Sequence, residues 1–277
     1  MSRVTARRRM VRITPAGEIR RPDSLAVEEP LELRIDGQSL TVTMRTPGND
    51  VDLAHGFLLS ENIIGVADDI VSARYCAGTD QDGRNTYNVL DIGLRTATPI
   101  LARGFPTTSA CGLCGKTALD EVHARSRYPL PAEGPVVDAA VLSALPGELR
   151  SRQAVFDATG GLHAAGLFTA DGVALAVRED VGRHNAVDKV IGWAMRENRI
   201  PAGDLVLVVS GRASFELVQK AVMAGIPMLA AVSAPSSLAV DLAADSGLTL
   251  AGFVRGETMN IYTGAHRVAR RSATLAI

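Results

Sequence analysis

Cys111 and Cys114, a cysteine pair separated by two residues, are the side chains of this sequence best suited to covalent chemistry. They lie in the run ACGLCGK, where small residues precede an amphipathic stretch, so we expect a loop that leads into a helix N-terminus. The reactive form of cysteine is the thiolate, and its pKa falls beside a helix N-terminus and a cation such as Lys116. Gly112 and Gly115 permit close backbone approach and motion. The pattern therefore predicts a reactive cysteine sulfur atom that can approach more than one partner molecule.

Other uses of the pair have to be weighed against reactive sulfur. A zinc site needs four ligands at recurring spacing, and the only other cysteine, Cys76, stands alone. A structural disulfide is disfavoured because the chain has three cysteines, no secretory signal and enough length to build its own core. A thioredoxin-type dithiol stays open, although its CxxC is expected early in a small βαβ unit. From the residues alone, reactive sulfur is favoured over metal.

The composition describes a globular chain of one large or two modest domains. It has 277 residues, of which 47% are hydrophobic and 21% charged. A net charge of −1 and 4% aromatic residues argue against nucleic-acid binding. The arginines from Arg7 to Arg12 are followed by no apolar signal segment and are interpreted as a solvated arm, and no stretch is long enough to span a membrane. We expect a cytoplasmic protein with reduced cysteines.

Residues 1–133 are predicted to form an amino-terminal α+β portion that includes the CxxC loop. Alternating residues on either side of Asp36-Gly37 predict a hairpin. Helical spacing from Asn49 to Asn62, behind an Asn or Asp cap, predicts a helix. The runs ARYCAG and TYNVLDIGL are candidate strands, and LPAEGP at 130–135 is the best linker.

Residues 134–277 have a different order of predicted elements, in which helices alternate with apolar strands. Helices are predicted over 138–156, 182–198, 212–224 and 236–247, and strands over 163–170, 173–180, 204–210, 228–233 and 248–256. Such an order indicates a layered α/β/α sheet.

The first of three polar segments in this second part is REDVGRHNAVDK, at 178–189. Asp180 could cap the helix, and His184 and Asp188 are four residues apart on one face, opposite an apolar stripe. From this segment alone, a capped helix with a solvated polar face is somewhat favoured over a catalytic role.

The other two polar segments are SGRASFE, at 210–216, and FVRGETMN, at 253–260. Gly211 follows a strand at the expected start of a helix, where free amides could hold phosphate and Arg212 would add charge. Arg255 and Glu257 follow the expected last strand of the sheet. Since ligands of open α/β sheets gather at the carboxyl ends of strands, we expect all three segments to lie at one ligand-binding edge.

Taken together, these motifs resemble the FdhD family (FdhD/NarQ) of formate dehydrogenase accessory sulfurtransferases. The resemblance rests on ACGLCGK (110–116), REDVGRHNAVDKVIG (178–192), SGRASFELVQKA (210–221) and FVRGETMNIYTG (253–264), with DLAHGFLLSENII (52–64) in the amino-terminal part. It implies a cytidine-deaminase-like α/β/α domain after a smaller α+β portion, in a homodimer. It also implies transfer of sulfur from a cysteine desulfurase to the molybdenum bis(molybdopterin guanine dinucleotide) cofactor, before the cofactor enters formate dehydrogenase.

The resemblance also assigns site residues. It places the persulfide on Cys111. We expect Cys114 either to protect or resolve the persulfide or simply to shape the loop, and His184 to be a further cofactor-binding candidate whose role, chemical or structural, the sequence leaves open. We expect GDP to act as a fragment of the cofactor, with Gly211 and Arg212 as further phosphate contacts. The family's cofactor-binding stretch falls on Phe253, Val254, Arg255, Gly256, Glu257 and Thr258.

A deaminase-like fold raises the alternative of zinc-dependent deamination. Zinc deaminases need an H-x-E segment and a PCxxC, whereas no histidine here is followed two residues later by glutamate, and Ala110 precedes Cys111. We therefore predict no metal. The remaining alternatives are a cofactor chaperone that does not handle sulfur and, less favoured, a thiol-disulfide oxidoreductase.

Overall fold

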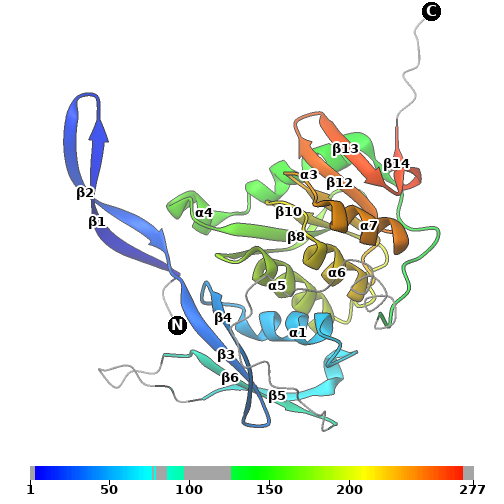
Figure 1. Cartoon of the computed structure of the whole chain (residues 1–277), viewed down its shortest axis with the longest axis horizontal. Helices are drawn as coiled ribbons and strands as arrows, with labels where there is room; N and C mark the ends of the chain where they lie inside the picture. Colours follow the sequence, from blue (N-terminus) through cyan, green and yellow to red (C-terminus); the bar gives the residue numbers. More distant parts are fainter. Residues whose placement is uncertain (1–3, 77, 79–85, 97–125, 271–277) are drawn as a thin grey trace, which may run out of the picture.

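The computed structural model of the chain describes residues 4–76, 78, 86–96 and 126–270. Cys111, Cys114 and the helix expected from about Lys116 lie outside the described residues. The fold is mixed α/β, with a long hairpin, a small sheet, and a larger sheet flanked by helices (Figure 1).

The hairpin at the amino-terminal end projects from the rest of the molecule (Figure 1). Strand β1 (Thr5–Thr14) pairs antiparallel with β2 (Gly17–Ala26) along its whole length. The arginines from Arg7 to Arg12 lie exposed on β1, so the expected arm is solvated. It is nevertheless a regular β-ribbon, because the backbone hydrogen bonds of β1 are satisfied by β2.

The small sheet has the strand order β4-β3-β6-β5. Its strands are β3 (Glu29–Ile35), β4 (Gln38–Arg45), β5 (Ile70–Tyr75) and β6 (Val89–Leu94). The predicted hairpin is confirmed: Asp36 and Gly37 have φ angles of 48° and 80°, as a type I′ turn requires.

Helix α1 (Asp50–Ser60) follows the small sheet's first hairpin, within the predicted range. Asn49 is the N-cap residue of α1, as predicted, but its side chain makes no cap hydrogen bond. Its backbone is left-handed, with a φ of 57°, whereas a capping side chain normally needs extended backbone at that position. A short 3₁₀ turn, η1 (Ala67–Asp69), leads from α1 toward β5.

The large sheet has six strands among the described residues, in the order β13-β12-β11-β10-β8-β9. Five of its strands were expected, and β13 was not. The strands are β8 (His163–Thr169), β9 (Ala174–Asp180), β10 (Leu205–Val209), β11 (Met228–Ala231), β12 (Thr249–Arg255) and β13 (Thr258–Thr263). Strands β10, β11 and β12 are parallel. Strand β9 has the same direction, since β8 is antiparallel to both β9 and β10.

Helices cover both faces of the large sheet, as the buried side chains show. One cluster joins Leu142 and Leu149 of α3 to Phe168 and Val208, and a second joins Leu167 and neighbouring inward residues to α1, α5, α6 and α7. The helices are α3 (Ala139–Arg150), α4 (Ala154–Thr159), α5 (Arg183–Arg196), α6 (Phe215–Met223) and α7 (Ser237–Asp245). The short strands β7 (Val137–Asp138) and β14 (Val268–Ala269), with the 3₁₀ turn η2 (Ala265–Arg267) before β14, complete the described chain.

The single helix predicted over 138–156 is wrong, because α3 ends at Arg150 and a separate α4 begins at Ala154. Gln153, between them, has φ and ψ of −92° and 69°, which is not helical. The carboxylate of Glu179 accepts hydrogen bonds from the free amides of Val155 and Phe156, at 2.9 and 2.7 Å. Glu179, on β9, therefore stabilises the start of a second helix, α4.

Helices α1 and α5 cross with their backbones in contact. A Cβ atom added at Gly56 would lie 1.9 Å from the carbonyl oxygen of Asp188, and one at Gly192 would lie 1.8 Å from that of Asp52. The crossing joins the two parts of the chain. One core cluster contains Leu31 and Leu90 of the small sheet together with Val187 of α5. The division at residues 133 and 134 stays a prediction, but the two parts share this buried core.

Candidate functional site

The three polar segments all follow strands that end at the same edge of the large sheet. They come after β9, β10 and β12, which have a common direction. The amino-terminal end of the antiparallel β8 lies at this edge too, at His163. The expectation of a shared carboxyl edge is confirmed, but the side chains divide between two cavities there.

The larger cavity has a volume of about 840 Å³ and lies between this edge and the α3–α4 segment. Val254, Arg255 and Gly256 of the predicted cofactor-binding stretch line it. Arg255 is exposed at the end of β12, whereas Val254 is buried. Glu257 and Thr258 do not line it and are exposed in the turn and at the start of β13.

Phe253, in the same stretch, has an unusual backbone. Its φ is 52°, which is rare and costly for an aromatic residue, and the pairing register with β13 shifts between Gly252 and Arg255. The Phe253 amide is bonded to the carbonyl of Ser233 on the β11 side. This irregular strand end turns Val254 inward and leaves Arg255 at the cavity.

The predicted phosphate cradle at Gly211 is wrong in its geometry. Helix α6 begins at Phe215 with Ser214 as its N-cap, so Gly211 lies four residues before the helix and its amide is not one of the helix's free amides. The intervening Ala213 instead forms a bridge with Pro235. Gly211 lies beside His163, and Arg212 is exposed and lines neither cavity.

The smaller cavity, of about 270 Å³, lies where α1, α5 and α6 meet the small sheet, and His184 lines it. His184 Nε2 is 2.6 Å from a carboxylate oxygen of Glu216 and 3.5 Å from the hydroxyl of Ser214. Both contacts fall on the same ring nitrogen, so these residues do not form a serine–histidine–carboxylate relay, in which the two partners occupy different nitrogens. The hydrogen bond from His184 lowers the pKa of Glu216.

Asp188, one turn further along α5, is almost fully buried and ion-paired. Lys220 Nζ lies 2.7 and 2.8 Å from its two oxygens, and the Ser60 hydroxyl donates from 3.2 Å. Burial raises the pKa of Asp188, although Lys220 and Ser60 oppose the shift. The explanation of this segment as a solvated polar face is wrong, because this face of α5 packs against α1 and α6.

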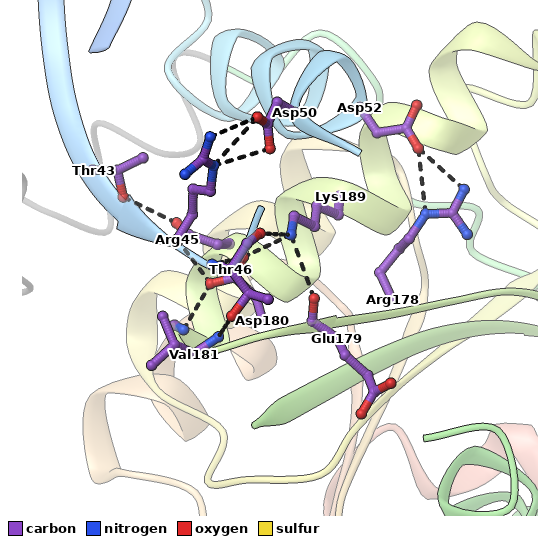
Figure 2. A network of polar contacts seen from close by, with 12 residues as sticks. Thr43, Arg45, Thr46, Asp50, Asp52, Arg178, Glu179, Asp180, Val181 and Lys189 are labelled. Carbon is purple, nitrogen blue, oxygen red and sulfur yellow. Dashed lines mark hydrogen bonds and ion pairs between the residues drawn. The ribbon is translucent and has the colours of Figure 1, made fainter. Parts of the chain in front are cut away.

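Asp180 is not a helix cap either. Gly182 is the N-cap of α5, and Asp180 is a fully buried strand end that lies 2.7 Å from Lys189 Nζ. Figure 2 shows Lys189 reaching Asp180 and the carbonyls of Thr46 and Glu179. The Thr46 amide donates to Asp180 from 3.1 Å, which ties the end of β4 to the end of β9.

Two further ion pairs connect the same region (Figure 2). Arg45 is fully buried and binds Asp50, at the start of α1, at 3.0 Å. Arg178 of β9 lies 3.1 Å from Asp52. The junction of the two sheets is therefore polar, and these charged side chains are paired with one another.

Only a short stretch of chain separates the two cavities. Val181 lines the larger one and its neighbour Gly182 lines the smaller one. Burial lowers the pKa of His163, and the nearby Arg183 and His184 lower it further. His163 lines the larger cavity beside this stretch.

Three residues of the larger cavity were missed because the predicted continuous helix concealed the break between α3 and α4: Arg150, Gln153 and Phe156. His163, at the start of β8, was also missed. A buried glutamine beside a break in a helix would have been a usable signal, but burial is not visible in a single sequence.

Within the described ranges, no three His, Cys, Asp or Glu side chains are grouped so that they could hold a metal ion. Cys76, beside β5, is a free and partly buried thiol. None of the helices described is both long enough and apolar enough to span a bilayer.

Comparisons with known proteins agree with the sequence motifs. A sulfur carrier protein FdhD of Nocardia farcinica is 75% identical over 271 residues, which are 98% of this chain and 97% of the relative. A protein of the same name from Mycolicibacterium paratuberculosis is 60% identical and covers 96% of this chain and 99% of its own length.

A solved structure shares the fold. A protein from Desulfotalea psychrophila, described as a formate dehydrogenase accessory protein, superposes with a TM-score of 0.76 at 22% identity, over 96% of this chain and 100% of its own. The sequence model of the FdhD/NarQ family matches residues 26–269. This chain therefore belongs to the FdhD/NarQ family.

Proposed function

We propose that this protein is a sulfur carrier that supports formate dehydrogenase. The observation that carries the proposal is the 75% identity, over nearly the whole chain, to a protein named as a sulfur carrier. The CxxC run at 110–116 supplies thiols of the required kind. In the proposed reaction the Cys111 thiolate attacks the terminal sulfur of a persulfide on a cysteine desulfurase. A new sulfur–sulfur bond forms on Cys111 while the donor cysteine leaves as a thiol, so no net oxidant is consumed.

The proposed acceptor of this sulfur is the molybdenum bis(molybdopterin guanine dinucleotide) cofactor, held as a substrate. The larger cavity supports this assignment, because a mainly apolar cleft with a few polar groups at the carboxyl edge of a sheet is the usual form of a nucleotide site. Val254, Arg255 and Gly256 would contact the nucleotide end, with Arg255 near its phosphates. Phe253, Glu257 and Thr258 would shape the turn that carries Arg255.

The smaller cavity is a second candidate contact with the cofactor. His184 and Glu216 would be its polar groups. A cytidine-deaminase-like arrangement belongs to the same proposal and is supported by a mixed sheet with helices on both faces. We further propose a cytoplasmic homodimer, with Cys114 assisting or protecting the persulfide.

Mass spectrometry after incubation with a cysteine desulfurase and cysteine tests the proposal. The wild type should gain the mass of one sulfur on the peptide that contains Cys111, and Cys111→Ala should gain none there. Cys114→Ala should still load, because one thiol suffices to carry a persulfide.

Three outcomes would contradict this scheme. If Cys111→Ala gained sulfur and Cys114→Ala did not, the carrier would be Cys114. A protein that binds the cofactor but never gains sulfur would be a chaperone. A Cys111–Cys114 disulfide that turns over with thiols but carries no persulfide would indicate an oxidoreductase.

A further inference from the structure

Gln153 is a buried polar side chain with an unused hydrogen-bonding group. It is 3% exposed and lines the larger cavity, between α3 and α4. Its carboxamide has no hydrogen-bond partner within the described part of the chain, and it does not cap α4. Its amide atoms are not among the fully inaccessible unpaired atoms of the described chain, so the carboxamide is accessible from the cavity that it lines. A ligand in the cavity can therefore complete its hydrogen bonds.

The surroundings of Gln153 suit a planar ring. Phe156 lines the cavity one turn away, and the guanidinium carbon of Arg150 lies 4.6 Å from the centre of its ring. Arg150 is also paired with Asp157 at 2.5 Å, so its charge is already compensated at this point. Arg255 also lines the cavity and is exposed. The cavity lining thus combines an amide, an aromatic ring and an arginine available for an anionic group.

We infer that Gln153 recognises the lactam edge of a 2-amino-4-oxopyrimidine ring. This edge presents a ring N–H donor beside a carbonyl acceptor, and a carboxamide can pair with both because it carries one acceptor and one donor side by side. Guanine and pterin both have this edge, so the inference rests on the proposed cofactor and specifies which chemical group of it Gln153 contacts. Phe156 provides an aromatic surface for the ring.

Calorimetry with two diphosphates tests the inference. One is GDP, and the other is purine riboside diphosphate, which lacks both lactam groups. The wild type should bind GDP about tenfold more tightly, because two neutral hydrogen bonds distinguish the ligands. Gln153→Leu should bind both ligands equally, at the affinity of the wild type for the analogue. Gln153→Glu should keep a preference for GDP, since a carboxylate still accepts from the ring N–H and the 2-amino group.

Matched measurements separate recognition from structure. Gln38→Leu removes an exposed carboxamide at the start of β4, away from both cavities, and should leave both affinities unchanged. Gln153→Leu should unfold at about the same temperature as the wild type, since the amide that it removes has no partner in the described part of the protein. If Gln153→Leu instead weakened GDP and the analogue equally, or lowered the unfolding temperature, Gln153 would be structural and the inference would be wrong.

A third ligand, 6-hydroxymethylpterin, shows whether the ring that Gln153 recognises is guanine or pterin. Binding of this pterin that depends on Gln153, without binding of GDP, would assign the cavity to the pterin and uphold the inference. GDP binding that is insensitive to Gln153 would refute the inference and leave the proposed function intact. Binding of neither ligand to the wild type would count against the proposed cofactor site, and with it the inference.

Discussion

Lys189 Nζ and a carboxylate oxygen of Asp180 lie 2.7 Å apart, and both side chains are almost completely sealed from solvent. Asp180 ends β9 and also accepts from the amide of Thr46, at the end of β4. The Lys189 ammonium binds the carbonyl of Thr46 at 2.9 Å. One buried charge pair therefore holds the edges of both sheets together, a few residues from each cavity.

Lys189→Met should destabilise the protein by about 3–5 kcal/mol, because it leaves the Asp180 carboxylate buried without a counter-charge. Urea unfolding at neutral pH measures the change. Arg196→Ala is the control, since that arginine is half exposed in its ion pair with Asp52 and should cost at most about 1 kcal/mol. If the two variants lost similar free energies of unfolding, the Asp180–Lys189 pair would stabilise the protein no more than a half-exposed ion pair does.

Gly56→Ala should prevent normal packing of α1 on α5, because the new methyl group would overlap the carbonyl oxygen of Asp188. Gly192→Ala should behave in the same way. We expect poor soluble yield or a large fall in the thermal midpoint. Gly147→Ala is the control, since nothing lies within 4 Å of its added Cβ and alanine favours a helix. A normal midpoint for Gly56→Ala would mean that the helices can separate at little cost.

The protein should lose stability as the pH falls below about 6.5, partly through His55. Burial lowers the pKa of this histidine, whose Nδ1 lies 2.8 Å from the Val51 carbonyl. The unfolded chain then takes up the proton first as the pH falls, so the loss begins at the unfolded pKa and continues down to the folded pKa.

His55→Gln should accordingly reduce the difference between the urea midpoints measured at pH values of about 7.5 and 5.5. His163, whose pKa is also lowered by burial, should account for part of what remains. An unchanged pH dependence in His55→Gln would show that this ring titrates alike in both states.

Arg255→Ala should weaken GDP binding by about threefold, because the arginine is exposed and its contact with phosphate would be screened by water and salt. GMP, with one phosphate fewer, should bind more weakly than GDP to the wild type and should be less sensitive to the substitution. Calorimetry at two salt concentrations measures both effects, with the exposed Arg199→Ala as the control. Equal GDP affinities of Arg255→Ala and the wild type would remove Arg255 from the site.

Much of the fold could be predicted from local patterns in the sequence. The turn at Asp36-Gly37, helix α5 and the apolar strands β10 and β11 have strong signals, because turn chemistry and periodicity are local properties. Strand β13 and the break before α4 were missed. Both depend on partners distant in the chain: β13 pairs with a bulged β12, and α4 begins where Glu179 accepts its amides.

The site was predicted less completely than the fold. The shared edge could be deduced from strand direction, but the division of His184 and Arg255 between two cavities depends on how α1 packs against α5. The roles predicted for Asp180 and Gly211 were wrong for two other reasons. A lone sequence does not show that Thr46 approaches Asp180 from another sheet, or that α6 begins four residues after Gly211.

The β1–β2 hairpin gives the molecule an electrical polarity. Its strands carry six arginines against two acidic residues, whereas the whole chain has a net charge of −1, so the remainder is acidic overall. Because the hairpin projects from the body, these opposite charges are separated in space and form a dipole moment (Figure 1). An acidic protein surface would therefore be approached hairpin first. At physiological ionic strength, where the Debye length is about 8 Å, this orienting torque acts only over the last stage of the encounter.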